Sequence, residues 1–141
     1  MAANQFAFHD FPKTFERELG RIKRYNYNSL EKLSLMYMHF SVSDIPIVLS
    51  ILPENLRSSD AIYQRGSHFF LLLPHTSREG ALHVQNVITD ILENSFKTVV
   101  VSFPEDGESV NDLFEMMEHT ADEEYEISIE RFWKNVEEKV A

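Results

Sequence analysis

Apolar side chains recur at helical spacing in four segments of the chain, which predicts four helices. Residues that favour the N-cap position precede two of these helices. Asp44 stands at this position before the second helix, and Thr76 or Ser77 stands there before the third. In chain order, the four segments are Phe11–Tyr25, Ile45–Pro53, Arg78–Leu92 and a long segment that begins at Val110 and runs nearly to the C-terminus.

Four other segments are apolar or β-branched and short enough to be strands. They are Leu33–Phe40, Ala61–Gln64, His68–Pro74 and Phe96–Phe103. The tripeptide Arg65-Gly66-Ser67 separates the second from the third and supplies the turn of a hairpin. This order of helices around a central hairpin predicts an α+β fold, with helices packed on a central, mainly antiparallel sheet.

Length and composition indicate a single domain that spans residues 1–141, since 141 residues with 43% hydrophobic side chains suffice for one core. Cysteine is absent, which excludes disulfides, thiol nucleophiles and zinc fingers and fits a reducing compartment, so we expect a cytoplasmic protein. The apolar runs have the length of strands, and we expect no membrane span and no signal segment. The four glycines are isolated, which excludes phosphate-binding glycine loops.

The formal net charge is −10, which argues against nucleic acid as a partner, because phosphate backbones are bound by basic faces. The charge is also unevenly distributed. Residues 1–103 carry ten acids and ten bases, whereas residues 104–141 carry thirteen acids and three bases. The net charge of the whole chain therefore does not describe any one surface, and charge-dependent binding has to be considered segment by segment.

Several short sequence motifs, which follow one another in the family's order, resemble the GGDEF (diguanylate cyclase) domain family over roughly residues 11–125. Arg65, Gly66, Ser67, His68 and Phe69 stand where the five signature residues would stand. The other segments that resemble the family are Leu56–Asp60, Phe70–Pro74, Arg78–Leu92, Thr98–Ser102 and Pro104–Gly107. The resemblance implies the nucleotidyl-cyclase-like fold of this family, with a ferredoxin-like core.

The departures from the family pattern lie at its catalytic positions. The resemblance implies that active members join two GTP molecules into cyclic di-GMP, with carboxylates holding divalent cations against the phosphates. Mg²⁺ requires oxygen ligands, but Ser67 and His68 replace the acidic pair, and His39 replaces the other metal-binding acid. Ser43–Asn55 is also too short to carry the family's phosphate and base contacts. We therefore expect a degenerate domain with no catalytic residues, no bound metal and no cofactor.

Arg57 and Asp60 resemble the family's product-binding motif, in which an arginine and an aspartate bind cyclic di-GMP. The guanidinium of such an arginine donates two hydrogen bonds to a phosphate or to the edge of a guanine. The aspartate carboxylate accepts hydrogen bonds from the N–H groups of the guanine. The alternative interpretation is a local surface pair that leads into the hairpin. The spacing from Asp60 to the signature is one residue shorter than usual, which weakens the comparison.

The histidines near the signature suggest two further chemistries, a metal site and a hydrolase. His39 and His68 are expected on neighbouring strands, where a softer metal such as zinc is conceivable. Structural zinc sites use four ligands and no third ligand is apparent, so two strand-end histidines are the better interpretation. A hydrolase built on Ser67, His68 or His75 has no nucleophile elbow and no orienting acid.

Two stripes remain for partner binding. A basic stripe on the first helix is either a solvated face or a contact for a nucleotide or an acidic partner; it comprises Lys13, Arg17, Arg21 and Arg24. Residues 126–141 are expected to form a helical extension with an apolar stripe, buried against the domain's own core, a second copy or a partner. That stripe comprises Ile129, Phe132, Trp133, Val136 and Val140.

Two hypotheses of function follow from these observations. The first is a catalytically inactive regulatory domain that acts through protein contacts, with a partner protein or as a homodimer. The second is a cyclic di-GMP receptor that binds through Arg57 and Asp60.

Overall fold

The computed structural model describes residues 4–6, 13, 17, 32–57, 60–92 and 95–129. Five strands form one sheet in the order β1-β3-β4-β2-β5. Every neighbouring pair is antiparallel except β1 with β3, which is parallel. The strands are β1 (Asn4–Phe6), β2 (Leu33–His39), β3 (Ala61–Arg65), β4 (His68–Pro74) and β5 (Lys97–Phe103).

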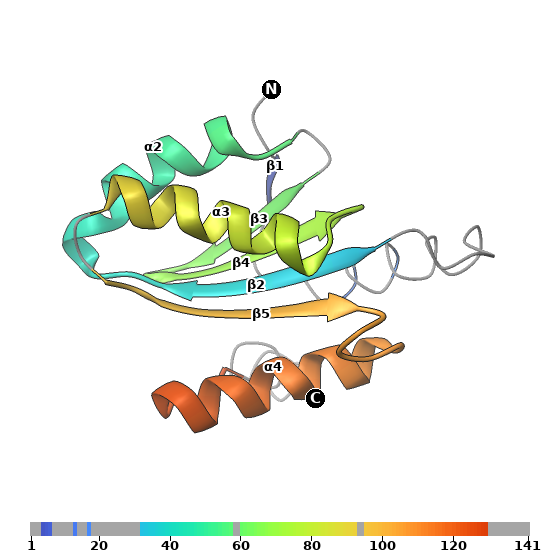
Figure 1. Cartoon of the computed structure of the whole chain (residues 1–141). Coiled ribbons are helices and arrows are strands. Elements are labelled where there is room, and N and C mark those ends of the chain that lie inside the picture. Colours follow the sequence, from blue (N-terminus) through green and yellow to red (C-terminus); the bar gives the residue numbers. More distant parts are fainter. Residues whose placement is uncertain are drawn as a thin grey trace.

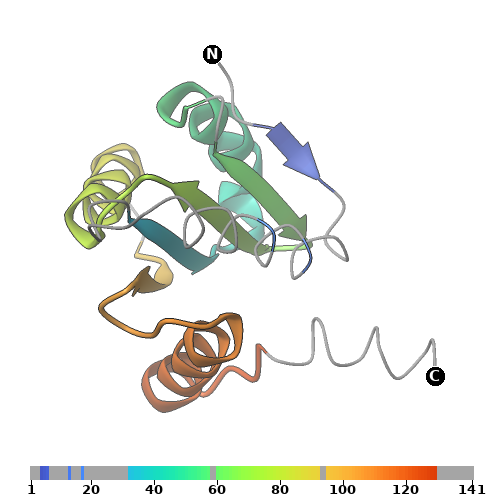
Figure 2. The same cartoon turned by 90° about the vertical axis from the view of Figure 1, so that its right-hand side faces the viewer.

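Helices cover both faces of this sheet (Figure 1). α2 (Ile45–Asn55), which follows a short 3-10 helix at Val42–Asp44, and α3 (Arg78–Ile91) lie on one face. α4 (Val110–Tyr125) lies on the other, and the view turned by 90° separates the three layers (Figure 2). The α+β architecture predicted from the sequence is confirmed.

The continuous apolar run of β2 is explained by its central position in the sheet. Leu35 and Tyr37 point to the core on the α4 side, whereas Met36 and Met38 point to the core beneath α2 and α3. All four side chains are at most 1% exposed. A strand covered on both faces needs apolar residues at successive positions, not alternate ones.

The helix starts follow the predicted caps in part. Ser77, not Thr76, caps α3, because its hydroxyl accepts from the Gly80 N–H. Asp44 occupies the N-cap position of α2 but makes no capping hydrogen bond from its side chain. The predicted end of α2 at Pro53 is wrong: the helix continues to Asn55, with Pro53 inside its last turn, where the missing N–H costs one helical hydrogen bond near the helix end.

The expectation of one unbroken helix from Val110 nearly to the C-terminus is also wrong. α4 ends at Tyr125, and Glu126 adopts a left-handed conformation with φ of 58°. The N–H of Glu126 donates to the Asp122 carbonyl, the bond that defines an αL helix end, and the N–H of Ile127 donates to the Ala121 carbonyl. Ile129 is fully buried in the core on the α4 side, which fits burial against the domain's own core.

Other expectations concern residues that the structure does not describe. Of the predicted helix Phe11–Tyr25, only Lys13 and Arg17 are described, and both are helical and exposed. The extension beyond Ile129 lies outside the described residues. β1 was not predicted from the sequence. Within the described ranges, no helix is both long and apolar enough to cross a membrane.

Candidate functional site

Four basic side chains form a row across the sheet at the end that carries the β3–β4 hairpin. Arg65 on β3 is the register partner of His68 on β4, which is the partner of His39 on β2. His39 is in turn the partner of Lys97 on β5. Directly opposite residues of neighbouring strands point to the same face. All four side chains of this basic row therefore belong to the sheet face that α4 packs against.

The two central histidines of the basic row are in contact. Their rings stack with centroids 4.4 Å apart and planes inclined by 23°. The hydroxyl of Tyr37, a fully buried residue, lies 2.8 Å from Nδ1 of His68, which fixes the orientation of that ring. The sequence placed His39 and His68 on neighbouring strands, and the structure brings them side by side.

The turn beside the row follows from its sequence. Gly66 has φ of 62°, a conformation that glycine adopts without steric cost, and a two-residue turn of Gly66 and Ser67 joins the paired residues Arg65 and His68. The N–H of Phe40 donates to the Ser67 carbonyl at 3.2 Å, which fixes the end of β2 to the hairpin. The turn and its two flanking residues, Arg65 and His68, are thus an ordered part of the sheet end.

The basic row does not fit a pair of magnesium ions. Hard divalent cations take carboxylate and carbonyl oxygens, and the row offers imidazoles, a guanidinium and an ammonium. Within the described ranges, no three His, Cys, Asp or Glu side chains are grouped as a metal site requires.

Arg57 and Asp60 lie at the opposite end of the sheet, beside the start of β3 and the end of β4 (Ala61 pairs with Leu72). The Asp60 carboxylate is almost fully buried and accepts from the Arg57 backbone N–H at 2.8 Å and from Arg57 Nη2 at 3.3 Å. The same guanidinium donates to the Pro74 carbonyl and the Thr76 hydroxyl. The pair therefore fastens the segment before β3 to the end of β4.

A cavity of about 330 Å³ adjoins this pair. Its lining includes Arg57, Asp60, His75, Thr76 and Ser77. The Arg57 side chain is 53% exposed, whereas that of Asp60 is 4% exposed. The guanidinium is thus accessible from the cavity, and the carboxylate is occupied by Arg57.

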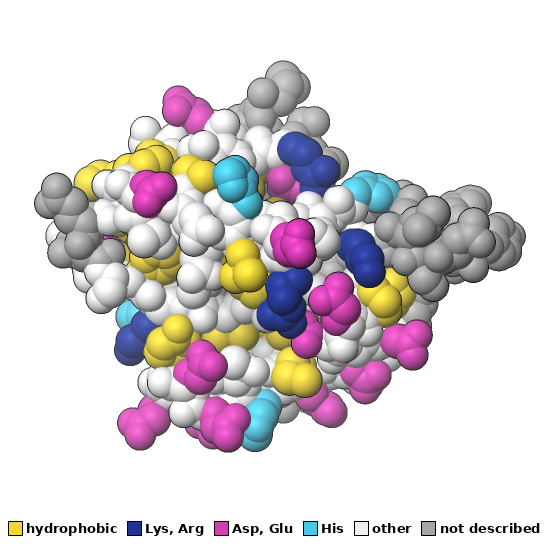
Figure 3. Space-filling view, in the orientation of Figure 1, with side chains coloured by type: hydrophobic (Ala, Val, Ile, Leu, Met, Phe, Trp, Pro, Cys, Tyr) yellow, Lys and Arg dark blue, Asp and Glu magenta, His cyan; other side chains and the backbone are white. Residues whose placement is uncertain are grey.

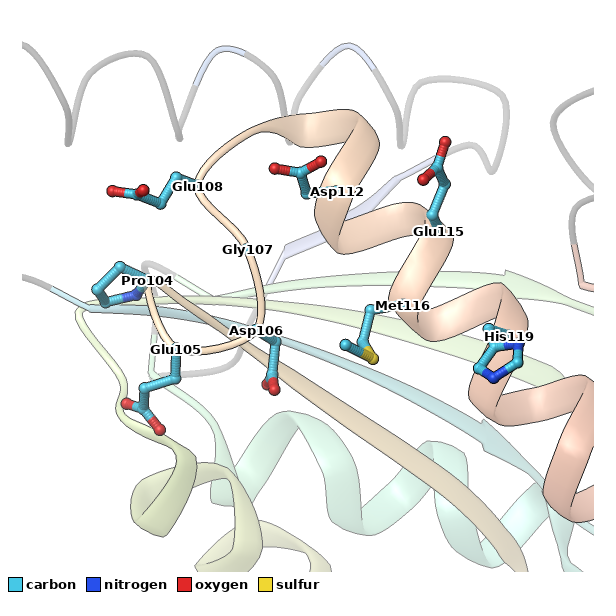
Figure 4. Close-up of a pocket in the computed structure, with 9 residues that line it drawn as sticks. All are labelled: Pro104, Glu105, Asp106, Gly107, Glu108, Asp112, Glu115, Met116 and His119. Carbon is cyan, nitrogen blue, oxygen red and sulfur yellow. The ribbon is translucent and has the colours of Figure 1, made fainter.

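A larger, acidic cavity, which no sequence pattern predicted, lies between the turn after β5 and the first turns of α4. Its volume is about 560 Å³. Figure 4 shows acidic side chains from the turn and from α4 around it. Arg78 bonds Asp106 and lies 3.8 Å from Glu105, which in turn is 3.7 Å from Lys32 Nζ. The five acids are Glu105, Asp106, Glu108, Asp112 and Glu115.

Solved structures of GGDEF domains share this fold. A DGC protein from Thermotoga maritima has a TM-score of 0.64 at 17% identity, with 83% of this chain and 95% of that chain covered. The GGDEF domain of YfiN (TpbB) from Pseudomonas aeruginosa has a TM-score of 0.63 at 17% identity, covering 84% of this chain and 90% of that one. The GGDEF domain of FimX from Pseudomonas aeruginosa has a TM-score of 0.61 at 13% identity, with coverage of 84% and 88%.

No protein-family model matches the chain, and no curated protein matches it. The structural likeness at these identities establishes the fold. The chain has the fold of these GGDEF domains, as the short motifs of the sequence indicated.

Proposed function

We propose that this chain is a catalytically inactive GGDEF-like domain that regulates other proteins through contacts. The observation that carries the proposal is the basic row at the hairpin end of the sheet. In the family that the sequence resembles, carboxylates at this end hold divalent cations against the GTP phosphates. Here the register places Arg65, His68, His39 and Lys97 in one line.

Electrostatics explains why the row opposes the cyclase reaction. Phosphoryl transfer in this family depends on divalent cations that neutralise the phosphate oxygens. Arginine and lysine at the same location repel such cations, and imidazoles do not replace the hard oxygen ligands. The substitution of several positions at once supports loss of the chemistry rather than a change of metal.

Calorimetric titration with GTP in the presence of Mg²⁺ tests this proposal. We expect no metal-dependent heat, because the row offers no carboxylate for the cation. The matched control is His39→Ala, which removes one of the two stacked histidines without adding an acid. We expect this variant to show no Mg²⁺-dependent heat of GTP binding either. Micromolar binding of GTP that requires Mg²⁺ would overturn the proposal.

A second candidate function is a receptor for cyclic di-GMP at Arg57 and Asp60. The half-exposed guanidinium beside a cavity of about 330 Å³ favours it. Against it, the Asp60 carboxylate already accepts two hydrogen bonds from Arg57 and is buried. Titration with cyclic di-GMP decides: micromolar binding that Arg57→Ala abolishes would establish the receptor, and absence of heat at high ligand concentration would exclude it.

The regulatory partner is a protein or a second copy of the chain, acting in the cytoplasm. The support is the acidic surface on α4 and the preceding turn, visible as acidic side chains along the lower part of Figure 3. Light scattering over a concentration series tests self-association, since a mass that stays monomeric leaves only a heterologous partner.

A further inference from the structure

Among the strands that the structure describes, β5 is the outermost on one side of the sheet. The outer edge of such a strand carries N–H and C=O groups without a neighbouring strand, and these groups are a template for pairing with another chain. In Figure 1 this edge runs between α3 and α4. What the side chains do along this edge therefore decides whether another strand can add to it.

Tyr125, the last residue of α4, covers the first part of the edge. Its hydroxyl accepts from the Thr98 N–H at 3.2 Å and donates to the Thr98 carbonyl at 3.1 Å. A single hydroxyl thus supplies Thr98 with one donor and one acceptor. These are the two groups that a residue of an adjacent antiparallel strand would supply.

Asp106 covers the far part of the edge in the same way. Its carboxylate accepts from the Ser102 N–H at 2.8 Å, and its own N–H donates to the Ser102 carbonyl at 2.8 Å. Arg78 bonds the same carboxylate and holds it in place. Two residues from different segments therefore each occupy one outward-facing backbone pair of β5.

The outward pairs of a strand recur at every second residue. Thr98 and Ser102 face outward, so Val100 between them does as well. A cavity of about 360 Å³ lies there, and Leu82 of α3 and Met116 of α4, exposed by 39% and 40%, belong to its lining. Between the two covered positions there is room for one residue of an added strand.

We propose that Tyr125 and Asp106 keep the β5 edge closed to a second copy of this chain and thereby limit its self-association. The three outward pairs are symmetric about Val100. In an antiparallel pair of two β5 strands centred there, Thr98 meets Ser102 of the partner subunit and Val100 meets the partner's Val100. The edge is therefore complementary to itself once the two covering groups are removed.

The test combines Tyr125→Phe, which frees the N–H and C=O of Thr98, with Asp106→Ala, which frees the Ser102 N–H and leaves the backbone N–H of residue 106 on the Ser102 carbonyl. Mass is measured by light scattering over a concentration series. We expect the mass of the double variant to rise toward twice the wild-type mass as concentration increases. Hydrogen exchange should show the Val100 amide becoming protected in the associated form. A folded double variant that keeps the wild-type mass at every concentration overturns the proposal, as does association that leaves exchange at Val100 unchanged.

Two controls separate the edge from a general effect of charge. Asp106→Asn keeps an oxygen that accepts from the Ser102 N–H, and its mass should remain that of the wild type. Asp112→Ala removes an equal charge from the first turn of α4 without touching β5 and should also leave the mass unchanged. An increase in mass for Asp112→Ala equal to that of Asp106→Ala contradicts the proposal.

The single variant Tyr125→Phe keeps the test decisive if the double variant does not fold. It removes one hydroxyl and retains the ring. We expect faster exchange at the Thr98 amide and a smaller rise in mass than for the double variant. Wild-type mass together with wild-type exchange at Thr98 overturns the proposal.

Discussion

Asp60 shows how one residue can suggest ligand binding in the sequence and serve the fold in the structure. Its carboxylate is buried and accepts from both the backbone and the side chain of Arg57. A buried acceptor with charge-assisted bonds contributes to stability, whereas a residue reserved for a ligand would be free to receive one. The arrangement therefore favours a structural role for Asp60, which the titration with cyclic di-GMP tests from the ligand side.

We predict that Asp60→Ala lowers the free energy of unfolding by about 1–3 kcal/mol, because the partly buried hydrogen bonds from the Arg57 N–H and guanidinium to this carboxylate are lost. Urea denaturation measures this change. The control is Glu54→Ala, an exposed acid of α2, for which we expect a change within about 0.5 kcal/mol. If the stability of Asp60→Ala were unchanged, Asp60 would not be needed for the fold, and ligand binding would be the better explanation of this residue.

The helices on the two faces depend on their N-terminal serines. Ser77 and Ser109 have extended backbones and accept from the N–H groups of Gly80 and Asp112. We predict that Ser77→Ala and Ser109→Ala each destabilise the chain by about 1 kcal/mol, since each leaves a helix N–H without its cap.

Thermal or urea unfolding with far-UV circular dichroism measures both serine variants. Ser50→Ala is the matched control, because Ser50 is exposed within α2 and caps nothing. A destabilisation of Ser50→Ala as large as that of Ser77→Ala would show that the loss is not due to capping.

Element order was largely predictable because strands and helices are set by local pattern. The apolar run of β2 and the 3.6-residue period of α3 gave both elements within one or two residues. β1 was missed because three residues, Asn4–Phe6, carry too little pattern. The end of α4 was missed because Glu126 adopts the left-handed conformation without the glycine that usually marks it.

The site was less predictable because it depends on register. His39 and His68 were placed on adjacent strands from the sequence, but Arg65 and Lys97 join them only because four strands pair in one specific alignment. The acidic cavity likewise unites a turn and a helix, which a linear pattern treats separately. The covering of β5 by Tyr125 and Asp106 is a tertiary feature of the same kind.

Across the molecule, a row of basic side chains and a group of acids occupy different regions, although Arg78 and Lys32 lie beside two of the acids. The chain carries a net charge of −10, yet the hairpin end of the sheet presents a basic row, and acids gather on α4 and the turn before it. A metal-dependent cyclase needs its acids at the hairpin end. The proposed inactivity and the proposed contact with a partner protein both rest on this distribution, with basic side chains at the hairpin end and acids on α4 and the turn before it.

The most direct test of this account is whether the chain makes cyclic di-GMP. The purified domain is incubated with GTP and either Mg²⁺ or Mn²⁺, and the products are separated by chromatography beside an added cyclic di-GMP standard. We predict that GTP remains unconverted and that no cyclic di-GMP accumulates over the blank. Formation of cyclic di-GMP in proportion to enzyme concentration would contradict the account.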